Sequence, residues 1–185
     1  MSPVLAAAAA LALAASPEAS RTFAVAQGSV LAYQLVHKFH VVEGVSGSVE
    51  GRARVLPDRS VQAMVRARVD SFNSGNGNRD ADMREATEAA RFPFVTLKVA
   101  GVLPEVASTP STVEARLPGE LTFHGRTKPI EVPVKLLFES PERVRVGATF
   151  AVSLEAFEVQ RPSLLFVKVE DRLDVTANLS LEAER

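Results

Sequence analysis

The chain has 185 residues, a length that suits one domain with a sizeable core, and its formal net charge is −1. Because a chain so balanced lacks the basic surface that phosphate backbones require, we expect no nucleic-acid partner. It contains no cysteine, which excludes disulfides and thiol chemistry.

The first 19 residues resemble an export signal. Residues 4–15 form an unbroken run of Ala, Leu and Val, too short to span a bilayer but as long as the apolar core of a signal peptide. Residues 12–14 (ALA) supply a small-x-small cleavage site, although no Lys or Arg precedes the run. We predict a signal peptide over residues 1–19 and a mature domain over residues 20–185. The alternative is a disordered or helical alanine-rich N-terminus. The mature chain holds no predicted transmembrane segment.

Apolar and polar residues alternate with a period of two through most of the mature chain. Between residues 49 and 55, for example, Val, Gly, Ala and Val alternate with Glu, Arg and Arg. Such alternation indicates antiparallel strands with one buried and one wet face. In chain order we predict eight strands, over residues 30–37, 46–56, 60–70, 94–102, 112–124, 128–139, 143–154 and 171–182.

A polar, glycine-rich stretch over residues 71–83 follows the third predicted strand. We predict one helix over about residues 79–90, with Asn78 or a neighbour as its N-cap. Asp80 and Asp82 would lie in the first turn, where the helix dipole favours anions. This helix could plug one end of a barrel or act as a lid.

Eight long antiparallel strands with one wet face close most economically into a barrel, because closure removes exposed strand edges. A two-sheet sandwich fits the periodicity equally well. The inner faces of residues 46–56 and 60–70 carry mostly Val, Ala and Gly, whereas later strands supply phenylalanines. The small residues either pack against the large ones or leave a cavity for one small ligand, and composition leaves both outcomes open.

The polar stretch lacks the standard phosphate and metal motifs. It has no Gly-Lys-Ser/Thr of a P-loop, and the glycine and glutamate of an EF-hand are absent at the required spacing. Oxygen ligands alone leave a looser calcium site as an alternative. The residues of that alternative site are Asn76, Asn78, Asp80 and Asp82.

The three histidines show no metal-binding spacing. His37 and His40 are three residues apart, which in one extended strand points them to opposite faces, and His124 lies at a predicted hairpin turn. We therefore expect hydrogen-bonded histidines, no metal site and no catalytic residues.

Several blocks of the sequence stand out by their kind, order and spacing. They are residues 36–37 with 44–51, residues 76–83 (NGNRDADM), residues 91–97 (RFPFVTL), residues 119–129 (GELTFHGRTKP), and Phe157 with residues 161–165 (RPSLL). Together these blocks resemble the YceI-like family of bacterial proteins, over nearly all of the mature chain. The resemblance implies an all-β fold, an eight-stranded antiparallel lipocalin-like barrel that holds a long polyisoprenoid chain. It also implies secretion to the periplasm and binding rather than catalysis.

Three positions depart from the family pattern. Asp82 stands where histidine is common, Arg126 where valine is common, and Glu158 where glycine is usual. Because none of the three falls in a predicted strand, they leave the fold prediction intact and leave the head group of the ligand open.

The leading hypothesis is a periplasmic binding or carrier protein, not an enzyme, for a polyisoprenoid or isoprenoid quinone buried in the barrel. No cofactor other than such a lipid is expected, and a homodimer is left open. The rivals are an enzyme with His and Asp at the barrel mouth, and a solid barrel without ligand. The predicted lining residues are Val65, Val69, Phe72, Phe94, Leu121, Phe123, Phe138, Phe150, Phe157 and Phe166, with Asn78, Arg79 and Asp80 at the mouth.

Two further expectations follow from this hypothesis. The polar residues at the mouth either meet a head group or hold their own loop through an internal pair between Arg79 and Asp80. A bulky replacement at Ala63 or Ala67 is expected to reduce ligand uptake more than stability.

Overall fold

The computed structural model describes residues 20–37, 40–106, 108–161, 163–164 and 167–184. The predicted signal peptide, residues 1–19, and the predicted lining residue Phe166 lie outside the described residues.

Strands make up most of the described chain, with one α-helix and two short 3₁₀ helices. The strands are β1 (Arg21–Val25), β2 (Val30–His37), β3 (His40–Ser46), β4 (Val49–Val55), β5 (Ser60–Arg68), β6 (Phe94–Val102), β7 (Ser111–Phe123), β8 (Arg126–Ser140), β9 (Arg143–Val152), β10 (Ser163–Leu164), β11 (Val167–Lys168) and β12 (Leu173–Ala183). The helices are η1 (Val69–Ser71), α1 (Gly77–Ala86) and η2 (Glu155–Phe157).

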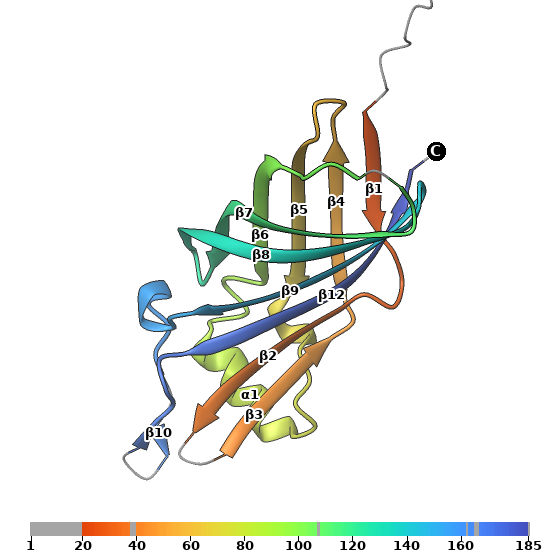
Figure 1. The fold of residues 1–185 in the computed structure, drawn as a ribbon. Coiled ribbons are helices and arrows are strands. Elements are labelled where there is room, and N and C mark those ends of the chain that lie inside the picture. The colour runs from red at the N-terminus through yellow and green to blue at the C-terminus, as the bar shows by residue number, and fades with distance from the viewer. Residues whose placement is uncertain (1–19, 38–39, 107, 162, 165–166, 185) are drawn as a thin grey trace, which may run out of the picture.

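The main sheet closes on itself into an antiparallel barrel (Figure 1). The ring of eight strands runs β1, β4, β5, β6, β7, β8, β9 and β12, and β1 then pairs with β12 to complete it. Phe23 of β1 shows the closure directly, because it faces Ala53 of β4 on one side and Ala183 of β12 on the other. The predicted barrel is therefore confirmed, and the sandwich is excluded.

The ring closes through residues 181–183 of β12, whereas residues 173–178 of that strand pair with β2, so the β2–β3 hairpin forms the end of the wall there. β2 pairs with β12 and β3 pairs with β2, so β3 ends the strand order. The other edge of β3 meets the chain at a single bridge between Val45 and Asn73, with both N–H to O distances 3.0 Å. Helix α1 begins just after this bridge, behind the β2–β3 hairpin in Figure 1.

The prediction that the helix follows strand three was wrong, because α1 follows the fifth strand. The strand predicted over residues 60–70 does precede α1, but it is the fifth strand because β1 and β3 were not predicted. The helix also begins and ends earlier than predicted. Asn76 caps it, since its Oδ1 accepts the N–H groups of Asn78 and Arg79 at 3.1 Å, and Glu88 already has a left-handed φ of 46°.

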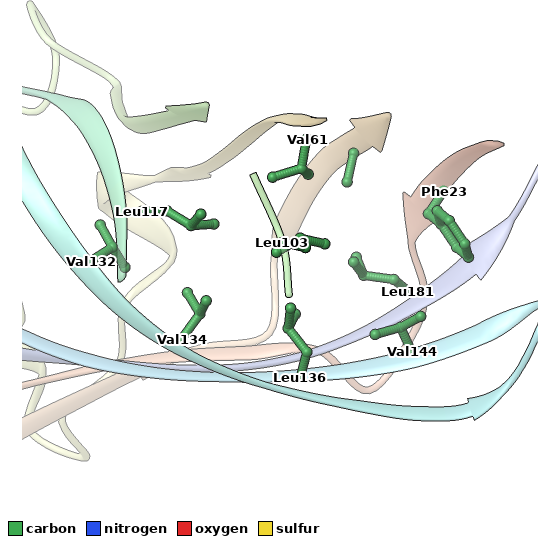
Figure 2. Close-up of a cluster of buried hydrophobic side chains, with 10 residues drawn as sticks. Phe23, Val61, Leu103, Leu117, Val132, Val134, Leu136, Val144 and Leu181 are labelled. Carbon is green, nitrogen blue, oxygen red and sulfur yellow. The ribbon is translucent and has the colours of Figure 1, made fainter. Parts of the chain in front are cut away.

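Buried apolar side chains from opposite walls meet inside the barrel. Figure 2 shows one cluster, in which Leu103, from the segment after β6, lies among side chains of β5, β8 and β12. A second cluster joins the segment after α1 to the region around η2. The members of that cluster are Val69, Ala89, Leu121, Phe123, Val152, Leu154, Phe157, Val159 and Val169.

Candidate functional site

The barrel interior holds a cavity of about 730 Å³ with an almost wholly apolar lining. This volume lies within the range of about 300–1,000 Å³ that is usual for small-molecule sites. The small residues of β4 and β5 help to leave it open, because Ala53 and Ala63 form a cross-strand pair and both line it. Composition left open whether the small residues pack against large ones or leave a cavity, and the structure shows a cavity.

Most of the predicted lining residues do border this cavity. Each lies on an inward-facing position of a strand or on η1 and the turn that follows it. They are Val65, Val69, Phe72, Leu121, Phe123, Phe138 and Phe150, joined at the mouth by Asn78 and Arg79.

Two predicted phenylalanines lie elsewhere. Phe94 sits under the guanidinium groups of Arg66 and Arg68, 4.8 and 5.8 Å from its ring centroid. Its neighbour Val95 lines the cavity, so strand alternation turns Phe94 outward. Phe157 is buried in the second cluster, behind the lining residue Phe123, at 5.8 Å between ring centroids.

Asp80 was predicted at the mouth, but it stabilises the loop before α1 instead. Its Oδ1 accepts hydrogen bonds from the backbone N–H and the hydroxyl of Ser74, at 3.0 and 2.6 Å. The Ser74 hydroxyl is the main reason that the pKa of Asp80 lies below its usual value. The loop is therefore held by Asp80 and Ser74, not by the alternative pair of Asp80 with Arg79.

Several lining residues were not predicted, because the predicted set consisted mainly of phenylalanines. Leu31 and Leu35 of β2, Val42 of β3, and Val134 and Leu136 of β8 all border the cavity. For the residues of β2 and β8, the signal that could have found them is the period-two alternation already used to predict the strands. Val42 lies in β3, which was not predicted.

Tyr33, also missed, places the one phenol of the chain in the cavity wall. It is 8% exposed, and its ring lies 5.6 Å from that of Phe72. Gly44 makes room for it, because a Cβ there would lie 2.4 Å from the ring. Burial raises the pKa of Tyr33, the Asp80 carboxylate raises it further and Arg79 opposes them, so the phenol remains an O–H donor at neutral pH.

His124 is a hydrogen-bonded structural residue, as predicted. It forms a two-residue turn with Gly125, at φ values of 49° and 69°. Its Nδ1 lies 2.9 Å from the carbonyl oxygen of Phe157 and its Nε2 lies 3.1 Å from Glu88 Oε1. Phe92 packs edge-on against the ring at 5.1 Å. The ring thus ties the β7–β8 hairpin to η2 and to the segment after α1.

The other two histidines are not arranged as predicted. His37 and His40 face each other across the β2–β3 hairpin and do not follow one another along one strand, because the chain reverses between them. Within the described residues, no group of three or more His, Cys, Asp or Glu side chains could hold a metal ion. In the same part of the chain, no helix is both long and apolar enough to cross a membrane.

The polar residues that border the cavity gather beside the free edge of β3, and we take this side as the mouth of the cavity. On one side, His40 and Val42 of β3 border the cavity, and on the other, Asn78, Arg79 and Asp82 of α1 do so. Among the described residues, the Val45–Asn73 bridge joins β3 through the backbone to the segment that precedes α1. Asp82, one of the three departures from the family pattern, therefore stands at the cavity rim.

The other two departures contact each other. Arg126 at the start of β8 forms an exposed ion pair with Glu158, just after η2. Glu158 has a left-handed φ of 56°, a conformation that favours glycine, which is the residue usual in the family. An exposed pair of this kind contributes about 0–1 kcal/mol, so it offsets only part of the cost of that conformation.

Comparison with solved structures finds the same fold in distant relatives. A polyisoprenoid binding domain from Saccharophagus degradans, implicated in plant cell wall breakdown, superposes with a TM-score of 0.72 at 17% identity, covering 88% of this chain and 98% of that one. BcnA from Burkholderia cenocepacia gives 0.68 at 16% identity, covering 82% and 95%. The Campylobacter jejuni YCEI protein gives 0.51 at 15% identity, covering 67% and 72%.

The family itself is shown by the sequence. No curated protein matches this chain. The family model for the YceI-like domain, however, matches residues 17–181, which is nearly the whole chain and includes every strand of the closed ring except the end of β12. The chain therefore belongs to the YceI-like domain family.

Proposed function

We propose that this protein binds a long apolar lipid, of the polyisoprenoid or isoprenoid-quinone type, in the barrel cavity and carries it in the periplasm after export. The observation that carries the proposal is the apolar cavity of about 730 Å³ inside a closed barrel. The likeness to a polyisoprenoid binding domain supports the choice of lipid.

The cavity volume sets the scale of the ligand. At about 30 Å³ per water-sized group, 730 Å³ holds about 24 groups. A chain of about 15 carbons fits this space and gains about 12 kcal/mol from burial, at about 0.8 kcal/mol per methylene. Association costs of about 4–15 kcal/mol offset much of this gain. The cavity therefore suits a lipid that is held reversibly, as a carrier requires.

The route into the cavity runs between β3 and α1. Helix α1 buries little of its surface, because Asp80 is the one buried residue among its members. The residues of α1 that border the cavity are Asn78, Arg79, Asp82, Met83 and Ala86. Segments with little buried apolar surface open at low free-energy cost. Helix α1 thus acts as a lid over the mouth.

Gentle purification followed by native mass spectrometry and solvent extraction tests the proposal. A co-purifying apolar molecule, released as the protein unfolds, is the expected result. A protein that is empty as isolated and also takes up no long isoprenoid contradicts the proposal. Stoichiometric zinc or iron would point to an enzyme. Cell fractionation with sequencing of the mature N-terminus tests export separately.

A further inference from the structure

The strand register identifies the end of the barrel that lies away from α1. Strand β5 leads from Ser60 toward α1, so Ser60 and its partner Val102 of β6 mark the opposite end, called the far end below. The β8–β9 turn lies at the same end, because β8 begins beside the α1 end of β7 and runs away from it. The far-end residues that border the cavity are Phe23, Val55, Val61, Leu103, Leu136, Phe138, Val144 and Leu181.

The wall between β6 and β7 opens toward the far end. The two strands pair only through Thr96–Val99 and Gly119–Thr122, although β7 already begins at Ser111. The chain leaves β6 at Val102 and crosses the end of the barrel instead of following β7 (Figure 1). Because the strands diverge there, side chains and not the sheet must close the cavity at this end.

Leu103, the first residue after β6, closes it. Leu103 borders the cavity but is only 7% exposed, and Figure 2 shows it among the buried side chains of the far end. Its backbone N–H donates to the carbonyl oxygen of Arg59 at 3.0 Å, which holds it against the β4–β5 turn. Leu117 of β7 fills the gap beside it, since a Cβ on Gly101 would lie 2.8 Å from Leu117 Cδ2.

We propose that Leu103 is the floor of the cavity and sets the longest isoprenoid chain that the barrel accepts. The inference rests on the proposed function, because a chain that enters at the mouth runs along the barrel and ends against this side chain. Affinity then rises with chain length up to about 15 carbons, the length that fits about 730 Å³. Further units stay outside the cavity and gain little, since they remain in water.

Prenyl alcohols of increasing length test the inference. Geraniol, farnesol and geranylgeraniol differ by one isoprene unit at each step, and their affinities would be measured by dye displacement on the protein as isolated. For the wild type we expect a large gain from geraniol to farnesol and a small one from farnesol to geranylgeraniol. Leu103→Ala makes room for about three more carbons, so geranylgeraniol should gain up to about 50-fold in affinity. Unchanged geraniol affinity would show that the variant is folded.

Two further replacements of Leu103 check the direction of the effect. Leu103→Phe raises the floor and is expected to weaken farnesol binding while leaving geraniol binding unchanged. This variant decides the question if Leu103→Ala does not fold. Leu103→Met conserves the volume and should keep the wild-type dependence on chain length.

Leu121→Ala is the matched control. Leu121 borders the same cavity and is 4% exposed, but it pairs with Leu97 in the side wall, nearer to α1. Its truncation adds the same volume beside the chain and not at its end. The step from farnesol to geranylgeraniol should therefore stay small in this variant.

The outcomes separate this inference from the proposed function. A dependence on chain length that stays as in the wild type in the folded Leu103 variants would overturn the inference and leave lipid binding intact. An equal shift in Leu121→Ala would also overturn it, because total volume and not the floor would then set the limit. If no prenyl alcohol binds the wild-type protein, both the inference and the proposed function fail.

Discussion

Replacing Ala63 with Phe tests whether the cavity is the binding site. Ala63 lies on β5 and borders the cavity, facing Ala53 across the β4–β5 pair. A cavity of about 150 Å³ holds one benzene ring, so the added phenyl group takes about a fifth of the 730 Å³. The lost space corresponds to about five carbons, or one isoprene unit. At about 0.8 kcal/mol per methylene, a cavity-filling chain loses up to about 4 kcal/mol, or about 10³-fold in affinity.

The assay is displacement of an environment-sensitive apolar dye by alcohols of increasing isoprenoid length. The chain has no tryptophan, so the dye signal is read without interference from indole fluorescence. Ala63→Phe is expected to weaken binding of geranylgeraniol strongly and of the shorter geraniol little. The stability of the variant should stay close to that of the wild type, because the ring enters open space.

Ala67→Phe is the matched control on the same strand. Ala67 is 1% exposed but does not border the cavity, so a ring there overpacks the wall at a cost of about 1–3 kcal/mol. For a chain of this size, that lowers Tm by about 2–12 °C. The sequence grouped the two alanines together, and the structure separates them. If Ala63→Phe destabilises the protein as much as Ala67→Phe does and leaves the affinity for long chains unchanged, the cavity is not the binding site.

Three further predictions follow. A disulfide between Cys replacing Val45 and Asn73, a hydrogen-bonded pair with suitable spacing, is expected to slow ligand uptake until a reductant is added, as dye-binding kinetics would show. Gly125→Ala is expected to lower the free energy of unfolding, measured in urea, by about 1–3 kcal/mol. The reason is that the φ of Gly125 is 69° and the new methyl would lie 2.5 Å from a ring carbon of Phe92. Asp80→Asn is expected to destabilise the protein at neutral pH. Since the Ser74 hydroxyl lowers the pKa of Asp80, that difference should begin to shrink in thermal melts below about pH 4, the unfolded pKa, and be lost as the pH falls through the lower folded pKa.

Each of these has an outcome that contradicts it. A disulfide replacing Thr122 and Thr127, which face each other across β7–β8 with their hydroxyls 2.8 Å apart, is the control that should not affect uptake. Equal slowing by both disulfides would show that entry does not pass beside β3. An unchanged urea midpoint for Gly125→Ala, or a pH-independent stability difference for Asp80→Asn, would contradict the other two.

The strands that were missed show the limit of periodicity. In β3 the buried positions are Gly44 and Ser46, whereas Val41 is 62% exposed, so burial does not follow apolar character. β3 pairs with a strand on one side only and borders the cavity mouth, which explains why a core pattern is absent. β1 reads RTFAV, two polar residues followed by three apolar ones, so its sequence does not alternate.

The sequence by itself determined most of the antiparallel strands, the polar loop with its capped helix, and the family to which the chain belongs. These depend on neighbours along the chain, where alternation and capping operate. Only the tertiary structure decided that Ala53 and Ala63 face open space, that Arg79 has an unpaired N–H at the mouth, and that Asp80 is used internally. Such features depend on which residues distant in sequence pack against one another when the barrel closes, and no local pattern encodes that packing.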